Sequence, residues 1–221
     1  MAVRRAVRPG ELVLDIGAHA GYYTLLFSRL VGASGAVFSF EPDPINFAVL
    51  RHNLRGSETK NVGTFNLAVS DRCGPVCFHR SAGSGNHSLF PYTEPVEITT
   101  VESTTIDAFL AARARPEVAL IKLDIEGAEI LALTGMRETL ERYEGVSLVV
   151  EYNPRALDSA GESPENLLRT LRSLGFQLWR LELDKAPEPV GPCFDPEPQG
   201  AINLFCSRLG PPGAGRETGV V

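Results

Sequence analysis

The chain has 221 residues, 43% of them apolar, which is enough for one well-cored domain and rather short for two. Its formal net charge is -6, and Lys and Arg do not cluster along it, which argues against a surface for nucleic acid. We therefore expect a single domain whose partner is not nucleic acid.

The first residues carry the positive charge of a secretory leader, but Arg8, Pro9 and Glu11 interrupt the apolar run that should follow. No stretch of the sequence is long and apolar enough to span a bilayer. The four cysteines have neither the spacing of a paired zinc site nor that of a disulfide framework. We expect a soluble, cytoplasmic protein with reduced thiols, in which Cys206 is buried in a strand.

An apolar strand that runs into a turn of small residues occupies residues 13–21. Asp15, near the end of the strand, can accept hydrogen bonds from a ligand, and Gly17 and Gly21 would let the backbone approach that ligand closely. A helix with a wide apolar face is predicted to follow over residues 22–31. In a doubly wound sheet, this succession of strand, turn and helix makes a nucleotide pocket.

Two cofactors compete for such a pocket. The pyrophosphate of a dinucleotide favours the pattern G-x-G-x-x-G, and this turn offers only Gly17 and Gly21 beside the acidic Asp15. S-adenosylmethionine carries a sulfonium and an ammonium but no phosphate, so an acidic turn suits it. The next strand, 36–40, leads to Glu41, whose carboxylate can bind both ribose hydroxyls of either cofactor. The glycine pattern favours S-adenosylmethionine over NAD.

Asp43 and Pro44 predict the start of a second helix, because Asp is a good N-cap and Pro fits the first helical turn. The residues expected on its buried side are Ile45, Phe47, Ala48 and Leu50. A third strand, near residues 64–69, ends in Ser70 and Asp71, which would lie at the same edge of the sheet as the other polar strand ends.

Residues 76–78 and 96–101 alternate between apolar and polar side chains, which indicates an inserted hairpin. The turn between these segments, residues 81–88, is rich in Gly and Ser, and we expect it to be mobile and to form part of a substrate lid. His87, in this turn, has a pKa suited to a general base, although an exposed loop histidine is often simply solvated.

The second half of the chain contains four predicted helices, over residues 105–112, 127–136, 138–143 and 163–175. The apolar runs 118–124 and 146–150 are typical of buried central strands. Residues 176–183 and 201–207 are the predicted closing strands, and residues 209–221, rich in Gly and Pro, are predicted to be a disordered tail.

This order of elements predicts an α/β fold: a doubly wound, Rossmann-like, mostly parallel sheet with helices on both faces, an antiparallel closing strand and a small β-hairpin insertion. Residues 1–208 would form the domain. Parallel strands bring their carboxyl ends to one edge of the sheet, where such folds bind ligands. The residues predicted at that edge are Asp15, Gly17, Glu41, Ser70, Asp71, Asp124 and Glu151.

Five segments together resemble the FkbM family of S-adenosylmethionine-dependent methyltransferases, within the class I methyltransferase fold. They are DIGAHAGYYT (15–24), FEPDP (40–44), AVSD (68–71), GNHS (85–88) and IKLDIEGAE (121–129). His19 departs from the family, whose turn often has Asn at this position.

The resemblance implies that the turn 15–21 holds the methionine part of the cofactor, Glu41 the ribose, and Ser70 with Asp71 the adenine. It also implies O-methylation of a hydroxyl group, often on a sugar or a natural-product scaffold. The cofactor-binding residues expected on this basis are Asp15, Gly17, Ala18, Gly21, Tyr22, Glu41, Ser70, Asp71 and Asp124.

Methyl transfer requires a positioned acceptor and a group that helps to remove its proton. Asp124 ends a buried strand beside the expected methyl group, Glu126 follows on the next turn, and Glu151 ends the neighbouring strand. With His87, these acids are the catalytic candidates. Lys122 lies on the same strand face as Asp124 and could pair with it or with Glu151.

Asp124, Glu151 and Asn153 could instead hold Mg²⁺, which would acidify a bound hydroxyl as in catechol-type methyltransferases; otherwise no metal is expected. Two other functions stay open. One is an NAD-dependent reductase, although none of the five tyrosines is followed by Lys four positions later. The other is a binding module that kept the fold without catalysis. We expect a small hydroxylated acceptor, and neither nucleic acid nor membrane as a partner.

Overall fold

The computed structural model describes residues 3–55, 59–83, 87–91, 94–114, 116–182, 184–191, 194 and 200–213. Its strands are β1 (Leu12–Ile16), β2 (Ala36–Phe40), β3 (Val62–Phe65), β4 (Ala68–Val69), β5 (Gly74–Ser81), β6 (Pro95–Thr104), β7 (Leu120–Leu123), β8 (Ser147–Tyr152), β9 (Gln177–Leu181), β10 (Glu188–Pro189) and β11 (Ile202–Ser207). Its helices are α1 (Val3–Ala6), α2 (Tyr22–Val31), α3 (Pro44–Asn53), α4 (Ile106–Ala111), α5 (Glu129–Thr134), α6 (Arg137–Arg142), α7 (Pro154–Ser159) and α8 (Pro164–Ser173). Parts of three predictions lie outside the described residues: Ser84, Gly85 and Asn86 in the hairpin turn, Leu183 in a closing strand, and residues 214–221 of the tail.

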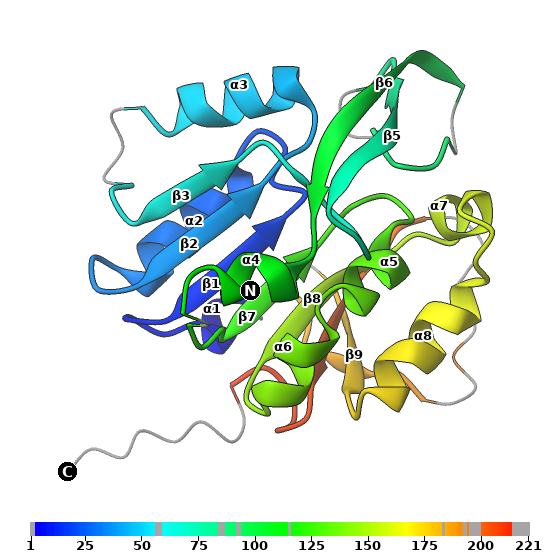
Figure 1. Ribbon diagram of the computed structural model, residues 1–221. Helices are drawn as coiled ribbons and strands as arrows, with labels where there is room; N and C mark the ends of the chain where they lie inside the picture. Colours follow the sequence, from blue (N-terminus) through cyan, green and yellow to red (C-terminus); the bar gives the residue numbers. More distant parts are fainter. Residues whose placement is uncertain are drawn as a thin grey trace.

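The large sheet has the order β10-β9-β11-β8-β7-β1-β2-β3. Strands β3, β2, β1, β7 and β8 pair in parallel, while β11 is antiparallel to both of its neighbours, β8 and β9. A second sheet of order β4-β6-β5 contains the inserted hairpin, β5 and β6, which rises beside the ends of the parallel strands (Figure 1). The predicted fold class, with its antiparallel closing strand and hairpin insertion, is confirmed.

Helices cover both faces of the large sheet, since α4, α5 and α6 lie in front of it and α2 lies behind it in Figure 1. Alternation along the strands supplies an apolar face to each layer. Leu14 and Ile16 of β1 belong to the core beneath α4, α6 and α8, whereas Val13 belongs to the core shared with α1 and α2. At the carboxyl ends of β1 and β7, the second face becomes polar, with Asp15 and Lys122 buried there.

Two local predictions need correction. The strand expected near residues 64–69 is divided between β3 in the large sheet and β4 in the small one. On α3, Ile45 and Ala48 are exposed, while the helix buries Leu50, which packs close to Gly21, and the polar Asn46, which lines the cavity described below. The short helices α1 and α7 were not predicted.

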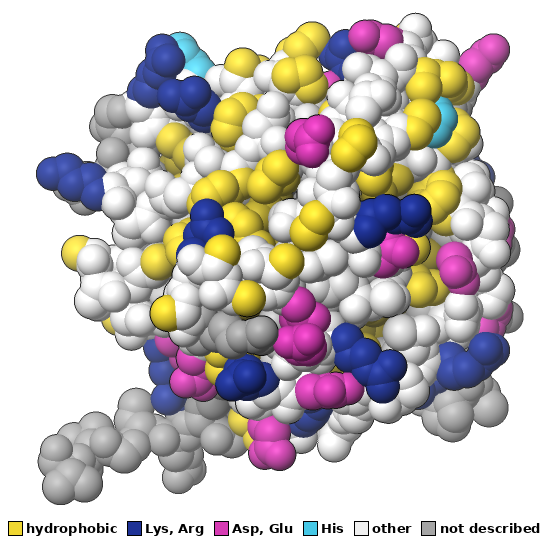
Figure 2. All heavy atoms as spheres, in the orientation of Figure 1, with side chains coloured by type: hydrophobic (Ala, Val, Ile, Leu, Met, Phe, Trp, Pro, Cys, Tyr) yellow, Lys and Arg dark blue, Asp and Glu magenta, His cyan; other side chains and the backbone are white. Residues whose placement is uncertain are grey.

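Within the described residues, no helix combines the length and the apolar character that crossing a membrane would require. On the face drawn in Figure 2, Lys and Arg side chains alternate with Asp and Glu side chains, and neither sign forms a continuous stripe on that face.

Candidate active site

A cavity of about 270 Å³ lies where the carboxyl ends of β1, β2, β7 and β8 meet the inserted hairpin. It is therefore at the edge of the sheet where the sequence predicts ligand binding. Its lining includes Gly17, His19, Glu41, Asn46, Phe78, His87, Ser88, Asp124, Glu126 and Glu151.

Two glycines shape the turn after β1 for reasons internal to the protein. Gly17 has a φ of 79°, and a Cβ atom there would lie 1.8 Å from the backbone oxygen of Asp124. Gly21 has a φ of 91°, and a Cβ atom would lie 2.7 Å from the side chain of Leu50. Both positions thus require glycine because the turn packs closely on β7 and α3. Close approach of a ligand, the reason we expected, is not needed to explain them.

The same turn positions Glu41 at the end of β2. The backbone N–H of His19 donates to Oε2 of Glu41 at 2.8 Å, and the N–H of Asp43 donates to Oε1 at 3.0 Å. His19 has a left-handed φ of 48°, a conformation in which Asn and His are enriched, which explains why either residue suits this turn. Glu41 is 5% exposed, and burial raises its pKa to about 7. Two backbone donors therefore fix a carboxyl group against the cavity.

Asp15 lies behind the cavity rather than on its wall. Its side chain is fully buried on the α2 face of the sheet, where Thr24 Oγ1 donates to Oδ2 at 2.6 Å and Lys122 Nζ lies 3.9 Å from Oδ1. Asp15 is not among the residues that line the cavity, and a direct contact with a ligand stays a prediction. The strand alternation turns its carboxylate away from the cavity and into the protein.

Five other predicted cofactor residues also lie outside the cavity lining: Ala18, Gly21, Tyr22, Ser70 and Asp71. Tyr22 is 67% exposed at the start of α2. Ser70 is buried and donates to Asp71 Oδ1, and Asp71 also pairs with Arg72 at 3.0 Å. The residues of the cavity wall nearest to Ser70 and Asp71 along the chain are Leu67, Ala68 and Val69.

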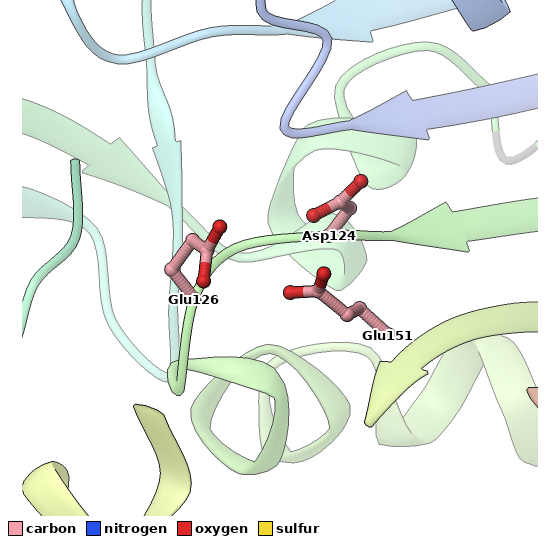
Figure 3. A group of neighbouring side chains, drawn as sticks. All are labelled: Asp124, Glu126 and Glu151. Carbon is pink, nitrogen blue, oxygen red and sulfur yellow. The ribbon is translucent and has the colours of Figure 1, made fainter. Parts of the chain in front are cut away.

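The three predicted catalytic acids all line the cavity, and Figure 3 shows their side chains next to one another. Asp124 follows β7, Glu126 lies on the turn after it, and Glu151 comes from the end of β8. One carboxylate oxygen of each residue lies within 4.8 Å of the others. The prediction that these side chains share one site edge agrees with this arrangement.

Each of these acids has a different environment. Lys122 Nζ donates to Asp124 Oδ2 at 2.9 Å, and Asn153 Nδ2 donates to Glu126 Oε2 at 3.1 Å. Oε2 of Glu151 is buried and has no hydrogen-bond partner among the described residues. Burial and the nearby carboxylates of Asp124 and Glu126 raise the pKa of Glu151 to about 9, so this group keeps its proton at neutral pH.

Lys122 is the cation that balances this end of the sheet. It is 2% exposed, and its Nζ lies 4.8 Å from the centre of the Tyr23 ring. Burial opposes its charge, but the carboxylates of Asp124 and Asp15 outweigh this effect and raise its pKa. Of the two partners proposed from the sequence, Lys122 pairs with Asp124 rather than with Glu151.

The side chains that could bind Mg²⁺ differ by one residue from those predicted. Asn153 uses its side-chain oxygen to cap α7, accepting from Ala156 N at 3.4 Å, and its amide nitrogen to bind Glu126. Glu126 takes its place beside Asp124 and Glu151. Three carboxylates would suit a hard cation such as Mg²⁺.

His87 is not the solvated loop residue that its turn suggested. Its side chain is 8% exposed, its Nδ1 accepts from the N–H of Ser81 at 3.1 Å, and its Nε2 lies 4.0 Å from Asp43 Oδ2. Arg80 pairs with the same oxygen of Asp43 at 2.6 Å. Burial lowers the pKa of His87. These contacts tie the hairpin to the start of α3, and they occupy the nitrogen that a general base would need.

Several lining residues were missed. Asn46, Phe78, Ser88 and Leu89 lie on the cavity wall because α3 and the hairpin fold over the strand ends. Ser88 Oγ donates to the backbone oxygen of Glu126, which joins the hairpin turn to the acidic part of the cavity. Only the GNHS segment gave a signal in the sequence, and it did not indicate this contact.

Comparisons with known proteins agree with this architecture. The 2-O-methyltransferase NoeI of Sinorhizobium fredii is 29% identical over 151 residues, which cover 61% of this chain and 61% of NoeI. The 31-O-demethyl-FK506 methyltransferase FkbM of Streptomyces tacrolimicus is 28% identical over 166 residues, covering 60% of this chain and 62% of the relative. The chain thus spans about three fifths of each of these relatives.

Among solved structures, methyltransferase FkbM from Methylobacillus flagellatus KT superposes with a TM-score of 0.58 at 17% identity. The match covers 89% of this chain and 43% of that protein, and it supports the fold. The model of the methyltransferase FkbM domain matches residues 15–178, which include the turn after β1, Glu41 and all three acids at the cavity. The chain therefore belongs to the methyltransferase FkbM family.

Proposed function

We propose that this chain binds S-adenosylmethionine in the cavity and transfers the methyl group to a hydroxyl of a small acceptor, such as a sugar or a natural-product scaffold. The observation that carries the proposal is the position of Glu41. Its carboxyl group is held at the end of β2 by two backbone N–H groups, and it faces the same cavity as Gly17 and Asp124. Each of its oxygens keeps a lone pair that can accept a ribose hydroxyl.

The part of the cavity lined by Asp124, Glu126 and Glu151 is where we place the acceptor. When bound, S-adenosylmethionine supplies an electrophilic methyl group, so that a C–O bond forms as the C–S bond breaks. Asp124, fixed by Lys122, is the carboxylate that we propose takes the proton of the acceptor hydroxyl, with Glu126 beside it. Glu151, which carries its own proton, would donate a hydrogen bond to the acceptor rather than act as a base.

Three other predicted residues receive supporting roles in this proposal. Asp15 and Gly21 would keep the turn after β1 in shape through their contacts with Thr24 and Leu50. His87 would position the hairpin over the cavity. The O-methyltransferases among the relatives support transfer to oxygen.

Calorimetric titration with S-adenosylhomocysteine tests the cofactor, with NAD titrated in parallel. Glu41→Ala removes the proposed ribose ligand, and we expect it to weaken binding of S-adenosylhomocysteine by about 10- to 100-fold, the effect of losing two hydrogen bonds. Glu141→Gln, which removes an exposed carboxylate on α6, should leave binding unchanged. The melting temperature of each variant shows whether it is folded.

Two results would contradict the proposal. Binding of NAD without binding of S-adenosylhomocysteine would favour a reductase. Binding of S-adenosylhomocysteine without methyl transfer to any hydroxylated acceptor would favour the binding module.

A further inference from the structure

The part of the cavity where we place the acceptor is lined by acidic side chains and by no basic ones among the described Lys and Arg residues. Asp124 and Glu126 line it with Glu151, and within the described residues no Lys or Arg lines the cavity at all. Lys122 lies behind the wall, where it binds Asp124 and approaches Asp15. A ligand in this part of the cavity therefore meets carboxyl groups and neutral groups but no fixed cation.

Glu126 is held in place more firmly than a residue on a surface turn. Its φ of 53° lies in the left-handed region, which costs free energy for a residue with a long side chain. Asn153 orients its carboxylate, and Ser88 binds its backbone oxygen. Contacts from two separate elements thus keep this carboxylate at the cavity in an unfavourable backbone conformation. Residues held in unfavourable backbone conformations often lie at sites that bind ligands.

We propose that Glu126 determines acceptor specificity: the cavity takes a polyhydroxylated acceptor that is neutral or positively charged next to the reacting hydroxyl, and it rejects one with a carboxylate there. This inference rests on the proposed function, because it assigns the acceptor to that same cavity. A hydroxyl or ammonium group can donate to Glu126, whereas a carboxylate has no proton to donate and meets the like charge of Asp124 and Glu126.

Three hexoses that differ in charge test the proposal on the complex with S-adenosylhomocysteine: glucosamine, glucose and glucuronate. Their binding is measured by ligand-observed NMR in buffer with EDTA. We expect glucosamine to bind at least about tenfold more tightly than glucuronate, with glucose between them. In Glu126→Gln, which keeps the shape and can still accept from Asn153, the difference should shrink by about tenfold. Glu141→Gln removes the same charge far from the cavity and should keep the wild-type order.

Equal binding of the three sugars, including no binding of any, would overturn the proposal, as would the same order in Glu126→Gln as in the wild type. Repeating the titration with Mg²⁺ separates another possibility: if glucuronate then binds best, the acids form a cation site and the proposal is wrong. Failure of S-adenosylhomocysteine to bind at the outset would instead count against the proposed function, so the two failures are distinguishable.

Discussion

The polar groups at the carboxyl edge of the sheet fall into two sets that differ in whether a cation of the protein balances their charge. Behind the turn after β1, Asp15 is fully buried beside Lys122 and Thr24. At the cavity, Oε2 of Glu151 is equally hidden from solvent, and like Oδ1 of Asp15 it has no hydrogen-bond partner among the described residues, but Oδ1 of Asp15 lies 3.9 Å from Lys122 Nζ. Both sets cost free energy to bury, yet only the first is balanced by the protein itself. The first set contains its own cation, and the second lies where we propose that a ligand binds.

The largest effect should come from breaking the balanced set at Lys122. Lys122→Met leaves two carboxylates without their cation, and we expect a loss of about 3–5 kcal/mol in the free energy of unfolding. Urea denaturation measures this loss. Lys185→Met, on an exposed ion pair with Glu182, serves as the control. If Lys122→Met were as stable as the wild type, the buried cation would not be required to balance Asp15 and Asp124.

A smaller loss is expected from Thr24→Val. This change keeps the volume of the side chain but removes the donor to Asp15 Oδ2 and the contact with Ser39 Oγ at 3.0 Å. We expect a loss of about 1–3 kcal/mol in the same urea measurement, the cost of leaving a buried acceptor without its donor. Thr134→Val should cost less, because Thr134 is exposed and its hydroxyl donates to Ile130 O in the same helix. Equal losses in the two variants would argue against this explanation.

Glu151, in the second set, should lower the stability of the folded protein, whereas Lys122 and Thr24 should raise it. The pKa of Glu151 is about 9 in the folded protein against an ordinary value of 4.5, so between these values the folded state holds a proton that the unfolded chain has lost. This group therefore lowers stability as the pH rises from 4.5 towards 9. Glu151→Gln cannot titrate, and its melting temperature should exceed that of the wild type by about 2–4 °C at pH 9.

At pH 5 the difference between Glu151→Gln and the wild type should be smaller than at pH 9, because the carboxyl group is then protonated in the folded protein. Melting curves between pH 5 and pH 9 measure this trend. A difference that does not change with pH would show that Glu151 does not titrate as its surroundings indicate.

The smallest effect is expected for Arg137, which pairs with Glu141 on the surface of α6 at 2.9 Å. Both side chains are mostly exposed, and water and salt weaken the attraction between them. Arg137→Ala should change the melting temperature by less than about 2 °C. A larger change would mean that charges on this surface contribute to stability as the buried ones do.

The sequence predicted the sheet well because its signals are local. The apolar runs before Asp124 and Glu151 and the cap at Asp43 are each readable from a few neighbouring residues, and the structure has strands and a helix there. The contacts that join distant segments were not readable. The burial of His87 against Asp43 and the bond from Ser88 to Glu126 depend on how the hairpin folds over the strand ends.

The direction of individual side chains was the other limit. Asp15 and Glu41 both follow from the pattern as polar residues at strand ends, yet Asp15 is the fourth residue of β1 and points into the α2 layer, while Glu41 lies one residue beyond β2 and faces the cavity. Asp15 is in register with Ser39, and Glu41 lies two positions beyond Ser39, so strand alternation alone would place both on one face. Glu41 faces the cavity because the chain has left β2 there and the N–H groups of His19 and Asp43 hold its carboxyl group.

The place of β11 in the sheet has a consequence for biosynthesis. It lies between β8 and β9 but follows both of them in the chain, so during translation these two strands are made before the strand that joins them. Until β11 arrives, the backbone groups of β8 that it will pair with lack their partners, beside apolar residues such as Leu148 and Val150. Open strand edges of this kind promote aggregation of incomplete chains. Substitutions in β11 should therefore affect the yield of folded protein more than the chemistry of the cavity.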